Sequence, residues 1–234
     1  MNKEYLKELL NQVNVELSDE KINKFISFKD ILLEWSEKIN LTTITEEKEI
    51  YKKHFVDSII PSKYIKENSK VLDVGTGAGF PGIPLKITRE DIDITLLDAV
   101  NKKINYLNDV IKRLNLDKIQ TVHSRAEDFA KENREKFDVV ISRAVANMST
   151  LSEYLLPFVK IGGTAICMKG PNIDEELNQA KKAINILGGK VQEVIEYTIP
   201  DTDLKYNLVI IKKERNTPKQ YPRKAGKPSS EPIK

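Results

Sequence analysis

The stretch Val71-Leu-Asp-Val-Gly-Thr-Gly-Ala-Gly-Phe-Pro-Gly82 decides the fold of this chain of 234 residues. It opens with strand-forming residues and runs directly into a glycine-rich turn. Gly75, Gly77 and Gly79 have no β-carbon, so the backbone can adopt positive φ there and approach a ligand closely. The prolines near the end of the stretch are tolerated in the first turn of a helix. The stretch therefore predicts a strand, a loop and a helix, with a cofactor at the loop.

Two classes of cofactor use this arrangement. Gly77, Gly79 and Gly82 match the pattern of a dinucleotide site, and Asp98 follows about twenty residues later, as an NAD-binding protein requires. Asp73 argues against that reading, because an acid leading into the turn opposes a pyrophosphate at the helix N-terminus. The same acid favours S-adenosylmethionine, which carries a sulfonium and an ammonium and no phosphate. We therefore favour S-adenosylmethionine. NAD, and a turn that only packs a helix on a strand, remain the alternatives.

Composition sets broad limits on the protein. A hydrophobic fraction of 40% and a charged fraction of 31% are typical of a globular chain, long enough for one α/β domain with an appendage. Cys167 is the single cysteine, which excludes a disulfide within the chain and favours an intracellular setting. The N-terminus contains acids and is no signal peptide, and no apolar run reaches membrane-spanning length. We expect a cytoplasmic protein without a membrane partner, and favour a monomer.

The net charge of +3 is unevenly distributed. Between Lys212 and Lys234 the chain has eight Lys or Arg and two Glu, so this segment carries +6 and the rest of the chain −3. A basic tail on a slightly acidic body suggests a polyanionic partner. The alternative is that the tail is solubilising disorder.

The rest of the chain alternates between strands and helices after a helical beginning. Strands are expected at 71–74, 92–98, 119–122, 137–142, 164–168, 190–199 and 206–212, and helices between them at 100–114, 148–158 and 169–187. Alternation predicts a parallel sheet, and the short last connection predicts an antiparallel closing pair. We expect an α/β, Rossmann-like class I methyltransferase fold with a seven-stranded, mostly parallel sheet. Its parts are a helical N-terminal extension (1–66), an S-adenosylmethionine-binding domain (67–213) and a basic, Pro-rich tail (214–234).

Ligands of such sheets bind at the carboxyl ends of the strands. Asp98 ends the second strand, where an acid can accept hydrogen bonds from ribose hydroxyls. Ala126 and Glu127 follow the third strand and fit an adenine ring and its amino group, although Glu127 also suits the first turn of a helix. Arg143 follows the fourth strand and can bind guanine O6, a phosphate or the cofactor carboxylate, or form a salt bridge at the mouth of the sheet.

The absence of several reactive motifs from the sequence limits the class of methyl acceptor. Cys167 lies within an expected strand, so it is no nucleophile for attack on a pyrimidine. Ser142-Arg-Ala-Val145 stands where methyltransferases of exocyclic amines carry Asn/Asp-Pro-Pro-Tyr. A ring nitrogen such as guanine N7 has no proton to remove, so positioning within about 3 to 3.5 Å of the methyl group is nearly the whole mechanism. His54 and His123 have no metal-ligand neighbours in sequence, and we expect no metal site.

Several motifs together resemble a known family, the ribosomal RNA small subunit methyltransferase G family, also called glucose-inhibited division protein B. They are Asp73–Pro84, Arg125-Ala-Glu-Asp128, Ser142-Arg-Ala-Val-Ala146, Lys169-Gly170, Thr217–Gly226, Trp35, Asn40-Leu-Thr42 and His54-Phe-Val-Asp-Ser58. The resemblance covers nearly the whole chain. It implies methyl transfer from S-adenosylmethionine to N7 of one guanosine in 16S rRNA, with the RNA or the small ribosomal subunit as partner.

By position, the resemblance implies that Gly75, Phe80, Ala126, Glu127 and Arg143 contact the cofactor and that the basic tail faces RNA. The chain departs from the family pattern at 205–207, Lys-Tyr-Asn, where many members have an arginine. The resemblance therefore carries no RNA contact to that position. A non-catalytic RNA-binding or cell-division factor is a further alternative, against which the intact glycine loop argues.

Overall fold

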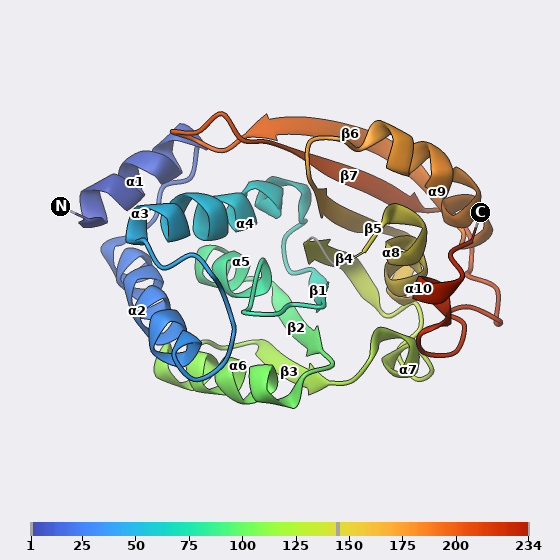
Figure 1. Cartoon of the computed structure of the whole chain (residues 1–234), viewed down its shortest axis with the longest axis horizontal. Coiled ribbons are helices and arrows are strands. Elements are labelled where there is room, and N and C mark those ends of the chain that lie inside the picture. The colour runs from blue at the N-terminus through green and yellow to red at the C-terminus, as the bar shows by residue number, and fades with distance from the viewer. Residues whose placement is uncertain (1, 144–145, 234) are drawn as a thin grey trace.

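The computed structural model describes residues 2–143 and 146–233, and its centre is a seven-stranded sheet in the order β3-β2-β1-β4-β5-β7-β6 (Figure 1). The strands are β1 (Lys70–Val74), β2 (Asp93–Asp98), β3 (Ile119–His123), β4 (Phe137–Arg143), β5 (Val159–Lys169), β6 (Gly189–Thr198) and β7 (Lys205–Lys213). The pairs among β1 to β5 are parallel, and β7 is antiparallel to both β5 and β6. The expected α/β sheet and its closing antiparallel pair are confirmed.

Helices flank the sheet and also precede it. The α-helices are α1 (Asn2–Gln12), α2 (Asp19–Ser36), α3 (Glu47–Ile50), α4 (Asp57–Ile59), α5 (Gly82–Thr88), α6 (Asn101–Arg113), α7 (Ala126–Phe129), α8 (Met148–Leu155), α9 (Asp174–Ile186) and α10 (Lys227–Ser230). A π-helical turn (Tyr51–Val56) joins α3 to α4, and 3₁₀ turns follow at Ile60–Tyr64 and Leu156–Phe158. Ser18 caps α2 by accepting from the Lys21 N–H, as its sequence position suggests.

The sheet has a buried core on each face, because successive strand residues point to opposite sides. Val71 faces the cluster that includes Phe25 and Phe55 of the N-terminal helices, whereas Leu72 faces the cluster that includes Leu151 of α8. Figure 1 shows the N-terminal helices along one side of the molecule and α8 and α9 along the other. The helical beginning of the chain therefore completes one face of the sheet and borders its carboxyl edge.

Two element boundaries differ from the sequence prediction by five residues. β5 begins at Val159 rather than near residue 164, because Gly162 and Gly163 lie within the strand, beside a register shift against β4, and not in a turn before it. A β-carbon on Gly163 would come within 2.7 Å of the Asp138 carbonyl oxygen, so close approach of two strands explains this glycine. The following helix, α9, starts at Asp174 and not at residue 169.

The C-terminal tail is folded onto the body of the protein, beside α7 and α8 (Figure 1). The Arg134 guanidinium donates to the Thr217 carbonyl oxygen at 2.7 Å and to that of Tyr221. Arg223 forms an ion pair at 2.7 Å with Glu153, whose side chain is fully buried. These contacts contradict the alternative that the tail is solubilising disorder. Of the motif at 142–146, Ala144 and Val145 lie outside the described residues.

Candidate active site

The glycine turn after β1 has the backbone shape that its sequence requires. Gly75, Gly77 and Gly79 have φ values of 69°, 59° and 87°, in the left-handed region that disfavours other residues. The N–H groups of Gly75 and Thr76 donate to the Leu97 carbonyl at 2.8 and 3.1 Å, which fixes the turn against the end of β2. A β-carbon on Gly77 would meet no atom closer than 3.9 Å, so its left-handed φ and not close packing accounts for this glycine.

Asp73 is the buried acid under this turn. Its Oδ2 accepts from the Thr76 hydroxyl at 2.6 Å and from the Gly82 N–H at 2.9 Å. Its Oδ1 is buried and has no hydrogen-bond partner in the described part of the chain. Burial raises the pKa of this carboxyl to about 6. A buried carboxylate oxygen without a donor is unfavourable, and positive charge near the turn stabilises the ionised carboxylate.

Asp98 lies at the end of β2, where the sequence places it. Its two oxygens accept from the Gly77 N–H and the Val100 N–H, both at 2.9 Å. The carboxylate therefore holds the glycine turn in place, and each oxygen keeps acceptor capacity for a further donor. Lys103 approaches to 3.9 Å. The structure thus brings Asp98 next to Gly77 across the adjacent ends of β1 and β2.

Ala126 and Glu127 open α7, just beyond β3, at the same edge of the sheet. Glu127 is buried, and its Oε1 accepts from the Gly226 N–H in the tail at 2.9 Å. Glu127 is an acid in the first turn of α7, as one expectation for it required, and its contact with adenine stays a prediction. No pattern in the sequence indicated the hydrogen bond between Glu127 and the tail, because Gly226 is 99 residues away.

Arg143 ends β4 and is held by the helical extension. Its guanidinium pairs with Asp57 at 3.0 Å and also donates to the Lys53 carbonyl and the Ser58 hydroxyl, each at 3.3 Å. The guanidinium carbon lies 4.8 Å from the centre of the Phe80 ring, a cation–π contact. The salt bridge at the mouth of the sheet, one of the roles considered for Arg143, is therefore present.

A wider network surrounds this ion pair, and sequence reasoning did not predict its contacts. The Tyr197 hydroxyl of β6 donates to Asp57 Oδ1 at 2.6 Å. His54 stacks on Phe80 with ring centres 4.6 Å apart, and its Nε2 lies 2.8 Å from the Thr42 hydroxyl. Burial and the nearby Arg143 charge lower the pKa of His54 to about 4, so the ring is neutral. The motif at 54–58 was a signal for Asp57, but none indicated Tyr197.

The single cysteine is far from a reactive environment. Cys167 is fully buried in β5, and burial raises its pKa to about 12, so it is a core residue. Within residues 2–143 and 146–233 no group of three His, Cys, Asp or Glu side chains is placed to hold a metal ion. No helix in these ranges is long and apolar enough to span a membrane.

This sheet order, with an antiparallel β7 inserted beside β5 and a glycine turn after β1, defines the Rossmann-like methyltransferase class. Solved structures show the same fold. The structure of M. jannaschii TYW2 in complex with AdoMet is 19% identical and has a TM-score of 0.53, covering 66% of this chain and 74% of that one.

 The Methanococcus jannaschii fibrillarin pre-rRNA processing protein is also 19% identical, with a TM-score of 0.52, and covers 68% of this chain and 74% of that one. At this identity the likeness shows the fold alone.

Sequence comparison identifies the family. Residues 21–205 match the family model described as rRNA small subunit methyltransferase G. A protein named ribosomal RNA small subunit methyltransferase G from Clostridium novyi (strain NT) is 55% identical over 225 residues, covering 94% of this chain and 93% of that protein. The protein of the same name from Alkaliphilus oremlandii (strain OhILAs) is 53% identical and covers 99% of each chain. The chain therefore belongs to the rRNA small subunit methyltransferase G family.

Proposed function

We propose that the protein transfers a methyl group from S-adenosylmethionine to N7 of one guanosine in 16S rRNA. The observation that carries the proposal is the unpartnered, buried Oδ1 of Asp73 beneath the glycine turn. A cationic cofactor supplies the charge that this carboxylate lacks, whereas a dinucleotide would bring a second anion to it. Membership of the family supports the same activity.

The chain offers a residue for each part of the cofactor. When bound, S-adenosylmethionine supplies a methyl group activated by its sulfonium. Asp73 balances the cationic end, and the glycine turn admits the ligand backbone closely. Asp98 accepts from the ribose hydroxyls, and Ala126 and Glu127 receive the adenine. These assignments follow from the position of the residues at the carboxyl edge of the sheet, where ligands of such sheets bind.

The acceptor atom follows from what the site can and cannot do with protons. Guanine N7 presents a lone pair and needs no general base. The neutral ring of His54 is hydrogen-bonded to Thr42, and the thiol of Cys167 is buried. Neither side chain is therefore free to act as a base or nucleophile, and methylation of N7 needs none. Arg143, held rigidly by Asp57, orients the cofactor or the base, and this pre-positioning provides the rate enhancement.

In this proposal each of the three segments of the chain predicted from the sequence has its own role. The extension at 1–66 holds Arg143 through Asp57, the domain at 67–213 binds the cofactor, and the tail at 214–234 meets RNA. The acceptor lies in the RNA of the small ribosomal subunit, which places the activity in the cytoplasm. We propose that a monomer acts.

The test is incubation of the purified protein with labelled S-adenosylmethionine and undermethylated 16S rRNA or small subunits. N7-methylguanosine is then mapped through its alkali-labile glycosidic bond. We expect one labelled guanosine. Cofactor binding without transfer to either form of the RNA would support the non-catalytic alternative, and binding of NAD in place of S-adenosylmethionine would restore the dinucleotide interpretation.

A further inference from the structure

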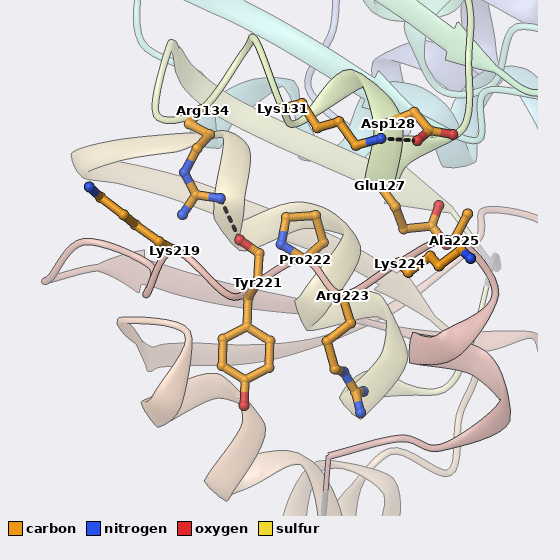
Figure 2. Close-up of a pocket in the computed structure, with 10 residues that line it drawn as sticks. All are labelled: Glu127, Asp128, Lys131, Arg134, Lys219, Tyr221, Pro222, Arg223, Lys224 and Ala225. Atoms are coloured by element: carbon orange, nitrogen blue, oxygen red, sulfur yellow. Dashed lines mark hydrogen bonds and ion pairs between the residues drawn. The ribbon is translucent and has the colours of Figure 1, made fainter.

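A hollow of about 700 Å³ lies between the tail and the segment that begins at α7 (Figure 2). Residues 219–225 form one wall, and the side chains of Glu127, Asp128, Lys131 and Arg134 form the other. Five of the lining side chains are cationic and two are acidic, so the hollow is basic. Its walls come from segments about ninety residues apart, and it exists only because the tail is docked.

Buried contacts hold both walls in place. The Arg134 guanidinium donates to carbonyl oxygens of the tail, and Arg223 forms an ion pair with the buried Glu153. Glu127 accepts from the Gly226 N–H, so the tail is also attached to the residue at the predicted adenine position. The hollow therefore adjoins the cofactor site, and its shape does not depend on a mobile arm.

Two of the cations remain available to a partner. Lys219 and Lys224 are exposed, and neither side-chain ammonium has an ion-pair or hydrogen-bond partner among the residues described. Figure 2 shows them on the tail at opposite ends of the hollow. Lys131 adds a third exposed ammonium, shared with Asp128 at 2.7 Å. Separated cations along an open hollow suit a chain of phosphates better than a single anion.

We propose that this hollow binds the sugar–phosphate backbone of the RNA substrate, with Lys219 and Lys224 contacting phosphates. The proposal rests on the proposed function, which makes RNA the methyl acceptor. Tyr221, which also lines the hollow, packs against the apolar core and so does not offer a free ring for base stacking. The contact is therefore with the backbone, and it positions the RNA beside the cofactor without selecting the guanosine.

The test removes the two free charges together, in Lys219→Gln/Lys224→Gln. The matched control is Lys66→Gln/Lys112→Gln, which removes two exposed lysines at the opposite, amino edge of the sheet. Binding of undermethylated 16S rRNA is measured as a function of KCl concentration, and S-adenosylmethionine binding by calorimetry. We expect the tail variant to bind RNA about tenfold more weakly and its salt slope to be about 1.5 shallower, while both variants bind cofactor like the wild type.

Equal RNA affinity and equal salt slope in the tail variant and the control would overturn the proposal, even if the wild type methylates RNA. A loss confined to cofactor binding would overturn it as well. Conversely, a shallower slope in the tail variant, in a protein that transfers no methyl group, would support the RNA surface and reject the proposed activity. The two failures are therefore distinguishable.

Discussion

The two flanks of the sheet's carboxyl edge differ in whether the charged side chains compared here are buried and paired or exposed and free. On the flank next to the N-terminal helices, which we call the paired flank, Asp57, Arg143 and Tyr197 are joined in one network. On the flank formed by α7 and the tail, the open flank, Lys219 and Lys224 stand in solvent. Buried charges must be paired because desolvation is unfavourable, whereas exposed ones remain free to meet a polyanion. Burial thus separates the charges that are paired inside the protein from those that we propose to contact RNA.

The largest effect is expected when the ion pair of the paired flank is broken. Asp57→Ala leaves the Arg143 guanidinium partly buried without its counter-ion, and we expect the free energy of unfolding to fall by about 3 to 5 kcal/mol. Urea unfolding measures the change. The double variant Asp57→Ala/Arg143→Met, which removes both charges, is the control and should recover to within about 1 kcal/mol of the wild type. If the double variant is as unstable as the single one, the ion pair is not the cause.

The second prediction concerns Asp73, whose pKa in the folded protein, about 6, exceeds its ordinary 3.8. As pH falls through 6 the carboxylate takes up a proton and loses the charge that binds the cofactor cation. Lowering pH from 7 to 5 should therefore weaken S-adenosylmethionine binding about tenfold. Asp73→Asn should bind about thirtyfold more weakly at pH 8 and lose this pH dependence. Calorimetry across pH tests both, and a wild-type profile in Asp73→Asn would assign the titration elsewhere.

A smaller effect is expected where only a hydrogen bond is removed. Tyr197→Phe keeps the Asp57–Arg143 pair and deletes one donor to the carboxylate, so we expect a loss of about 1.5 kcal/mol in unfolding free energy. Tyr206→Phe is the matched control, because no hydrogen bond of its hydroxyl is found in the described structure and its ring stacks on Tyr197. Equal losses in the two variants would exclude the Asp57 contact as the cause.

The smallest effect is expected on the open flank. Lys131→Gln breaks an ion pair with Asp128 that is largely exposed to solvent, and we expect no measurable shift of the urea midpoint. The same variant should weaken RNA binding slightly at low salt. A clear loss of stability would show that the exposed cations of this flank also contribute to folding, as its buried Arg223–Glu153 pair does, and would remove their contrast with the paired flank.

Much of the fold could be predicted because its signals are local. Hydrophobic patterns typical of strands alternate along the chain with patterns typical of helices. Asp73, Asp98 and Glu127 could be located because each lies close to the end of an expected strand. The boundary of β5 was wrong because a glycine pair marks a turn and a close strand contact equally well. Sequence pattern alone does not separate these two causes.

The partners of the site residues were not predictable for a different reason. Asp57 and Arg143 are 86 residues apart, and Asp57 and Tyr197 are 140 residues apart. No periodicity joins such positions, because only the sheet order brings β4 and β6 toward the N-terminal helices. The same holds for the tail, whose basic composition suggested a partner but not the surface on which it docks.

The docking of the tail also has a consequence for the order of synthesis. The anchors for residues 217–228 lie on Arg134, Thr150 and Glu153, all of which leave the ribosome earlier. The basic hollow is therefore assembled only after residue 228 has emerged, once the sheet has a completed β7 to lead into the tail. A chain that ends before Lys219 therefore has only one wall of the hollow, the one that Glu127, Asp128, Lys131 and Arg134 provide.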